Sequence, residues 1–135
     1  MIIEKIKAMP RMKASLEYSQ REYNIYSNML NKIENGDLRE KIINAQDMIF
    51  HEIEQKASEY KILSSAVDAL PGIQKSVIIY CYFKNGSKPG NKKERLSKHY
   101  ESLGLSYGKV KSIRKKALKT IEAAYLAGQA ELAEE

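Results

Sequence analysis

The stretch YESLGLSYGKVKSIRKKALKTI, residues 100–121, decides the fold of the C-terminal half of this chain. It predicts the end of one helix, a three-residue corner and a second helix with a basic flank. A corner of this kind needs a residue that tolerates positive φ, which glycine does best, then a hydrophobe and a helix cap. Apolar residues four and seven places after the cap seat the second helix. The residues in this register, which is typical of a helix-turn-helix, are Gly104, Leu105, Ser106, Val110 and Ile113.

The second helix should then show a polar, basic surface to solvent. Hydroxyls and lysines near the start of such a helix can meet base edges and phosphates in a DNA major groove. The residues expected on this surface are Ser106, Tyr107, Gly108, Lys111, Ser112 and Lys115. Lysines and an arginine beside it would neutralise backbone phosphates, and the basic start of the preceding helix would add to them. These flanking residues are Lys109, Arg114, Lys116, Lys119, Lys92, Lys93 and Arg95.

The net charge of +6 is distributed unevenly along the chain. Lys84 to Lys119 contains 12 basic and two acidic residues, a net +10. The remaining residues, 11 basic and 15 acidic, carry a net −4. A local excess of this size attracts a polyanion, of which nucleic acid is the commonest, although a solvated surface is the simpler alternative.

Two long amphipathic helices are expected before the basic region. Pro10 and the pair Asn35-Gly36 bound the first, and Asp37 is the expected cap of the second, which begins near Leu38. Neither helix can bury its apolar face alone, so the two should pack antiparallel as a hairpin that can also pair with another copy. The apolar faces are Leu16, Tyr23, Tyr26, Leu30 and Ile33 in the first helix, and Ile42, Ala45, Ile49, Ile53, Tyr60, Leu63, Val67 and Leu70 in the second.

The segment Leu70–Gly72, "LPG", ends the hairpin. The run IQKSVIIYCYF that follows is β-branched and aromatic, yet a helix is favoured because its surroundings are helical and no partner strand is visible. A basic loop is expected over Lys84–Asn91, and Asn91 with Glu94 forms a capping box for the next helix. The expected inner face of that helix is Leu96, Tyr100 and Leu103.

The 135 residues suffice for one domain or two small ones, and no apolar run approaches the roughly 18–20 residues that cross a membrane. The start is no signal peptide, and one cysteine, Cys81, excludes an intramolecular disulfide, so the cytoplasm is the expected compartment. His51 and Glu52 lack the second histidine of a zinc-protease helix and are expected at the surface. We expect no enzyme, metal site or cofactor.

Residues 70 to 122 resemble region four of bacterial sigma factors. The resemblance lies in Leu70-Pro71, Val77-Ile78, the corner at residues 104–106 and the basic helix carrying Lys116-Ala117-Leu118. A helical hairpin before such a domain is similar to phage-encoded transcription regulators of the ArpU and RinA type. That resemblance implies promoter DNA as the ligand and transcription regulation in a bacterial host. The basic loop is longer than the sigma-factor turn.

The expected architecture is therefore all-α, with a helical hairpin over residues 1–70 and a helix-turn-helix domain over 71–135. The leading function is a DNA-binding transcription regulator whose last helix reads duplex DNA. Its hairpin would mediate self-association or contact RNA polymerase. Two alternatives stay open. One is a phage small terminase subunit, and the other is a helical adaptor that binds RNA polymerase or a sigma factor rather than DNA.

Overall fold

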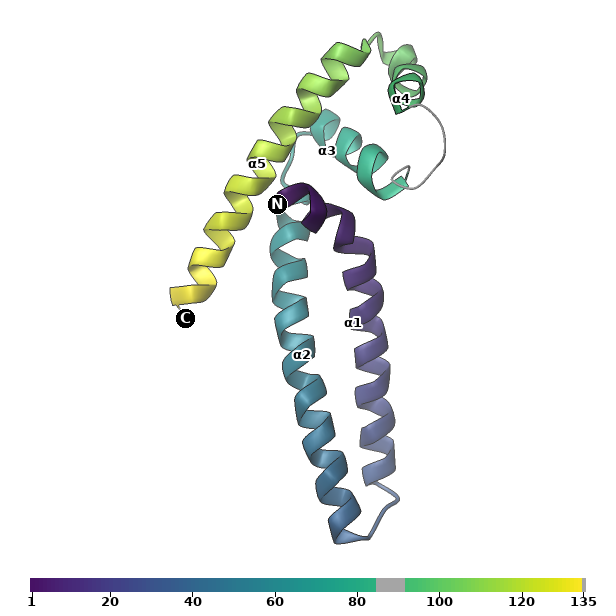
Figure 1. The fold of residues 1–135 in the computed structure, drawn as a ribbon, viewed down its shortest axis with the longest axis vertical. Helices are drawn as coiled ribbons and strands as arrows, with labels where there is room; N and C mark the ends of the chain where they lie inside the picture. The colour runs from purple at the N-terminus through teal and green to yellow at the C-terminus, as the bar shows by residue number, and fades with distance from the viewer. Residues whose placement is uncertain (85–91, 135) are drawn as a thin grey trace. The chain divides into compact units, whose positions relative to one another are not determined.

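The computed structural model describes residues 1–84 and 92–134, and all regular structure in these ranges is helical (Figure 1). This confirms the predicted all-α class. The run that could have formed a strand is helical too, and it ends in a π-helical turn. The elements in chain order are α1 (Ile2–Leu30), α2 (Gly36–Asp68), α3 (Gly72–Ile78), the π turn η1 (Ile79–Lys84), α4 (Lys92–Tyr100), the 3₁₀ turn η2 (Glu101–Leu103) and α5 (Tyr107–Glu134).

The chain packs as two compact units. The hairpin unit is Met9–Lys61, and the C-terminal unit combines Met1–Ala8 with Ile62–Glu135. The division predicted from the sequence, with a hairpin over residues 1–70 and a second domain over residues 71–135, stays a prediction.

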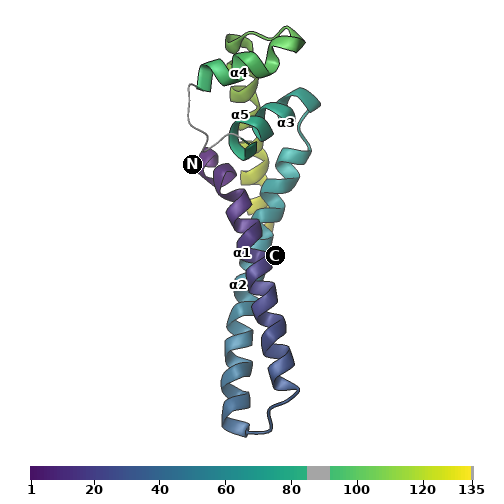
Figure 2. The ribbon, with the colours of Figure 1, turned by 90° about the vertical axis from the view of Figure 1, so that its right-hand side faces the viewer.

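The hairpin unit consists of antiparallel stretches of α1 and α2 (Figure 2). Gln46 Nε2 of α2 donates hydrogen bonds to the Tyr23 carbonyl oxygen at 3.2 Å and to Ser27 Oγ at 2.6 Å. Further along α2, Lys56 Nζ donates to Ser15 Oγ at 2.8 Å. Partners therefore move backwards along α1 as α2 advances, which confirms the predicted antiparallel hairpin.

The turn of the hairpin is closed by side chains from α2. Asn35 Oδ1 accepts a hydrogen bond from the Leu38 amide at 3.1 Å, so Asn35 is the helix cap. The predicted cap, Asp37, was wrong. Asp37 lies inside the first turn of α2, where its negative charge suits the positive end of the helix dipole. At the end of α1, Arg39 Nη1 donates to the carbonyl oxygens of Leu30 and, at 2.8 Å, Ile33, which satisfies acceptors that the helix leaves open.

The start of α1 also differs from the prediction. The helix begins at Ile2 and contains Pro10, so the boundary placed at Pro10 was wrong. Proline inside a helix costs about 3 kcal/mol relative to alanine because it lacks an amide hydrogen and crowds the preceding turn. The residues just before it are well buried: Ile6 is 0% exposed and Met9 is 5% exposed. Burial of that apolar surface offsets the local cost.

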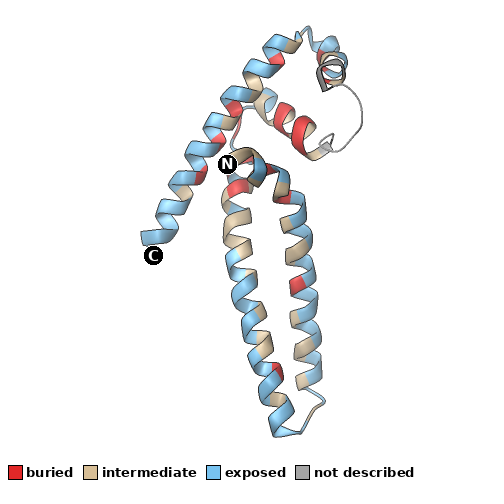
Figure 3. Ribbon diagram, viewed as in Figure 1, coloured by how far each residue is buried: buried red, intermediate tan, exposed pale blue. Residues whose placement is uncertain are grey.

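The core of the C-terminal unit joins the end of α2 to α3, α4 and α5. Helix α3 packs against α5, and α4 packs against α5 as well. Buried positions are concentrated in α3 and along one side of α5, as Figure 3 shows. None of the helices in the described part of the chain has the length and apolarity that a membrane span requires. The largest fully buried side chains here are Ile6, Leu63, Val77, Ile78, Leu96, Tyr100, Val110 and Ile121.

Two further expectations concern the approach to α4. Of the predicted loop, Lys84 belongs to η1, whereas residues 85–91, and with them the Asn91 cap, lie outside the described residues. The predicted inner face of the next helix is correct for Leu96 and Tyr100. It was wrong for Leu103, which is 63% exposed. The 3₁₀ turn explains the difference, because three residues per turn rotate Leu103 off the line of the α-helical face.

Candidate nucleic-acid interface

The corner between α4 and α5 is built on Gly104. Its φ is +69° and its ψ is +20°, and it is the one residue with positive φ in the described part of the chain. The Gly104 amide donates to the Glu101 carbonyl oxygen at 3.0 Å, and the Leu105 amide donates to the Tyr100 carbonyl oxygen at 3.3 Å. These two bonds form a Schellman motif, which ends a helix on a left-handed glycine. The predicted corner geometry is thereby confirmed.

The first turn of α5 is capped as predicted. Ser106 Oγ accepts a hydrogen bond from the Lys109 amide at 3.2 Å, and the Ser106 carbonyl oxygen accepts one from the Val110 amide at 3.0 Å. The side chain thus satisfies one amide that the start of a helix otherwise leaves unpaired. The corner and the cap together fix where α5 begins and which side of it faces the core.

Helix α4 is held in place by an aromatic cluster. Tyr100 is 1% exposed, and its hydroxyl lies 3.1 Å from Ser76 Oγ of α3. The Tyr80 and His99 rings stack with centroids 3.8 Å apart, and both rings meet Tyr100 edge-on. Burial raises the pKa of Tyr100 above its ordinary value, although the hydrogen bond between Tyr100 and Ser76 opposes the shift. The large side chain of Tyr100 therefore anchors α4 to α3.

The inner side of α5 seats the helix on the rest of the unit. Val110, Ala117 and Ile121 are each 0% exposed, and Ile113 is half-buried. These positions recur at the three- and four-residue spacing of one helical face. The predicted seating residues therefore face the core, which turns Lys111, Ser112 and Lys115 toward solvent.

The outer side of α5 is a continuous cationic surface. Gly108, Ser112, Lys115 and Lys119 recur at steps of four, three and four, offset from the buried stripe, and all four are exposed. No acidic residue occurs from Gly104 to Ile121. We define the α5 basic face as Gly108, Lys109, Lys111, Ser112, Lys115, Lys116 and Lys119, all of them exposed.

Among the side chains that the structure describes, no acidic residue forms an ion pair with a lysine of the α5 basic face. Within residues 1–84 and 92–134, the ion pairs involve other side chains, such as Lys75 with Asp68 at 3.3 Å. The five positive charges are therefore not neutralised by the described part of the chain. Five uncompensated charges along three turns of one helix make a field that attracts a polyanion.

Arg114 lies apart from the other predicted phosphate-binding residues. It is half-buried, and its Nη1 atom is buried without a hydrogen-bond partner. Burial raises the pKa of Tyr82, and the positive charge of Arg114 opposes that shift, which places the guanidinium near the phenol. The sequence already indicates the partial burial of Arg114, because this residue lies four positions after Val110 and three before Ala117, next to them on the helix.

The other predicted residues divide by exposure. Ser106 is exposed beside the corner, whereas Tyr107 and Arg95 are half-buried. Lys92 and Lys93 form the start of α4, and their side chains lie outside the described residues. The structure thus brings together the predicted residues of α5 other than Tyr107 and Arg114 on one exposed surface.

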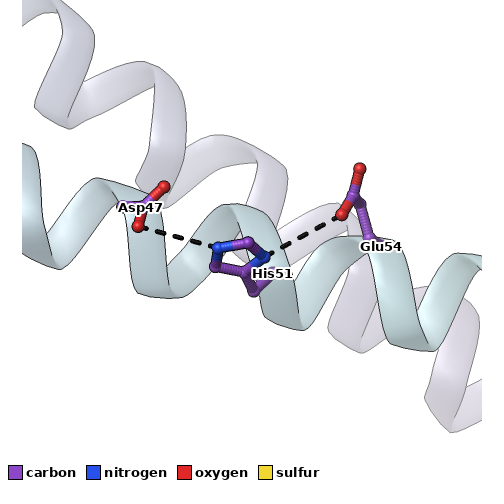
Figure 4. A network of polar contacts seen from close by, with 3 residues as sticks. All are labelled: Asp47, His51 and Glu54. Atoms are coloured by element: carbon purple, nitrogen blue, oxygen red, sulfur yellow. Dashed lines mark ion pairs between the residues drawn. The ribbon is translucent and has the colours of Figure 1, made fainter.

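Two features outside this interface offer metal-binding or nucleophilic side chains. His51 lies 3.6 Å from Asp47 and 3.9 Å from Glu54, but all three side chains are exposed (Figure 4). Throughout residues 1–84 and 92–134, no group of three or more His, Cys, Asp or Glu residues is arranged to hold a metal ion. Cys81 is 4% exposed, and its thiol is therefore screened from solvent. The α5 basic face remains the strongest candidate site.

Comparison of the chain with protein-family models, with curated proteins and with solved structures found no match.

Proposed function

We propose that this chain binds double-stranded DNA through the α5 basic face and regulates transcription. The observation that carries the proposal is a helix fixed by a left-handed glycine corner and a serine cap, with five exposed and unneutralised lysines on the side away from the core. A helix presented in this way can enter the major groove of duplex DNA. The charge alone is equally compatible with a solvated surface. The corner adds the helix geometry that reading DNA bases in the major groove requires.

The outermost stripe of the α5 basic face is the part that would lie deepest in the groove. Gly108 has no side chain and lets the helix backbone approach the base pairs closely. Ser112 offers a hydroxyl that can donate to or accept from base edges, and Lys115 can donate to guanine O6 or N7. Lysines on either side of this stripe would contact phosphates and set the orientation of the helix. These are Lys109, Lys111 and Lys116, and Lys119 at the far end of the stripe would contact phosphates as well.

The further elements of the proposal follow the resemblance to phage regulators of the ArpU and RinA type. Under it, the protein acts in the cytoplasm of a bacterial host and is encoded by a phage or prophage. Its hairpin unit associates with another copy or contacts RNA polymerase. The proposal assigns no enzymatic activity and no cofactor, since the α5 basic face offers binding chemistry only.

Two other functions use the same features differently. A small terminase subunit would join a DNA-binding helix to an oligomerising hairpin and would form a ring of eight or more copies. A helical adaptor would use the α5 basic face to meet an acidic protein. The exposed and unpaired lysines suit either polyanion, whereas the glycine corner and the cap favour a groove in DNA.

Selection of randomised duplex DNA by the wild-type chain, followed by sequencing of the bound fraction, tests the proposal. We expect an enriched motif that the variant Lys111→Glu/Lys115→Glu no longer selects. A matched control is Lys41→Glu/Lys61→Glu, which makes the same charge change at exposed lysines of α2. Equal loss in both variants would point to net charge alone, and binding without any enriched motif would exclude a sequence-specific regulator.

A further inference from the structure

The hairpin unit buries very little of its own apolar surface. Among residues 9–61 only Met9, Ser19 and Ile42 are buried. Figure 3 shows these helices almost wholly as exposed or half-buried positions. The apolar side chains outside the contact between these two helices therefore gain no stabilisation from burial within the unit. Seven large apolar side chains in this unit remain exposed: Tyr18, Ile25, Met29, Leu38, Ile43, Met48 and Phe50.

Helix α1 carries two separate stripes. The stripe toward α2 comprises buried and half-buried residues, including Ser19, Tyr23 and Tyr26. The other stripe is exposed along its whole length, and its apolar residues Ala14, Tyr18, Ile25 and Met29 recur at steps of four, seven and four residues. That spacing is the signature of a helix that pairs with another helix. The outer α1 stripe consists of Arg11, Ala14, Tyr18, Arg21, Glu22, Ile25 and Met29 of the helix, together with Lys32 just after its end, all of them exposed.

We propose that the outer α1 stripe pairs with the same stripe of a second copy, antiparallel and around a two-fold axis between Arg21 and Glu22. In this register each residue faces the one equally far on the other side of the axis. Tyr18 then faces Ile25 of the second copy, and the small Ala14 faces the large Met29. Arg21 faces Glu22 of the second copy, and the symmetric pair forms as well.

Charge decides between the two directions of pairing. In a parallel pair identical residues would face each other, so Arg21 would oppose Arg21 and Glu22 would oppose Glu22. The antiparallel register replaces these repulsions with two attractive pairs. It also places Arg11 opposite Lys32, but at the solvent-exposed ends of the stripe, where the interaction of two charges is weak. Two-fold pairing also meets the requirement that one patch serve both copies.

The occupant is thus a second copy of this chain, since the stripe is complementary to itself in both charge and size. The pairing does not depend on DNA, because it uses residues of the hairpin unit alone. Where the proposed function holds as well, a two-fold pair presents two α5 basic faces, and its DNA site should be an inverted repeat.

Sedimentation velocity over a wide range of protein concentration measures the self-association. We expect a monomer–dimer equilibrium in the wild type. Ile25→Glu should raise its dissociation constant at least about tenfold, because a carboxylate would be buried against the ring of Tyr18. The matched control is Ile43→Glu on α2, where the replaced side chain is 49% exposed against 57% for Ile25, and this variant should dimerise like the wild type.

A charge swap tests the register itself. Arg21→Glu should weaken the dimer about tenfold, because two attractive pairs become repulsive. The double variant Arg21→Glu/Glu22→Arg restores opposite charges and should dimerise within about threefold of the wild type. A monomer at all concentrations overturns the inference, as do a larger assembly, failed rescue by the swap, or equal loss in the Ile43→Glu control. Salt-dependent DNA binding by the monomeric Ile25→Glu variant would separate this result from the proposed function.

Discussion

Replacing Lys111 and Lys115 by glutamine should make DNA binding both weaker and less sensitive to salt. The α5 basic face holds five exposed lysines, and each one that neutralises a phosphate contributes about −0.9 to the slope of log affinity against log salt concentration. Five contacts give a slope of about −4.5, so wild-type affinity should fall about 500-fold between about 50 and 200 mM salt. Two fewer contacts leave a slope of about −2.7 and a fall of about 40-fold.

Fluorescence anisotropy of a labelled duplex, titrated at a series of salt concentrations, gives both slopes. At about 100 mM salt the glutamine variant should bind about 60-fold more weakly than the wild type. The control Lys41→Gln/Lys61→Gln removes two exposed lysines of α2 and should keep the wild-type slope. A wild-type slope shallower than about −2 would refute the reasoning. A control that changes the slope as much as the glutamine variant would refute it too.

Three further predictions concern stability, and urea unfolding followed by circular dichroism measures each. Gly104→Ala should lower the free energy of unfolding by about 1–2 kcal/mol, because alanine is strained at φ +69°. The control Gly72→Ala should not change it measurably, because Gly72 has no positive φ and has open space where the methyl group would lie. Arg114→Met should leave stability unchanged or raise it by about 1 kcal/mol, since it removes a buried donor without a partner; a large loss would contradict that assignment. Stability should fall as the pH rises above about 10, because burial raises the pKa of Tyr100 and the unfolded chain loses its proton first. Tyr100→Phe should make this fall shallower, and an unchanged slope would show that other groups cause it.

The corner of the C-terminal unit could be predicted from the sequence because its determinants are local. A glycine in the left-handed region, a serine cap and two apolar residues at fixed offsets act within about three turns of chain. The burial of Val110 and Ala117 follows from the same helical periodicity. These features depend on backbone sterics and on spacing, both of which the sequence contains directly.

Other features could not be predicted because several local solutions compete. Asn35 and Asp37 are both good caps, and the hydrogen bond to the Leu38 amide decides for Asn35. Pro10 stays helical because the burial of neighbouring residues outweighs its local cost. In the candidate site, Arg114 was assigned by its charge, whereas its position in the helical period turns it toward the core. The outer α1 stripe could not be predicted because the charged pair Arg21 and Glu22 interrupts its apolar residues.

Helix α5 connects the proposed interface to the packing of the unit. Its first half carries the α5 basic face, and its second half is held against the remainder of the C-terminal unit. Tyr125 lies under the Lys5 ammonium at 5.2 Å, and a methyl group at Gly128 would lie only 2.7 Å from Ile62 Cγ2. A close approach of this kind requires glycine, so α5 is seated at both ends of its length. The lysines of the α5 basic face are therefore presented by a fixed helix. The proposed binding of DNA would not have to order this helix first, which lowers the entropic cost of association.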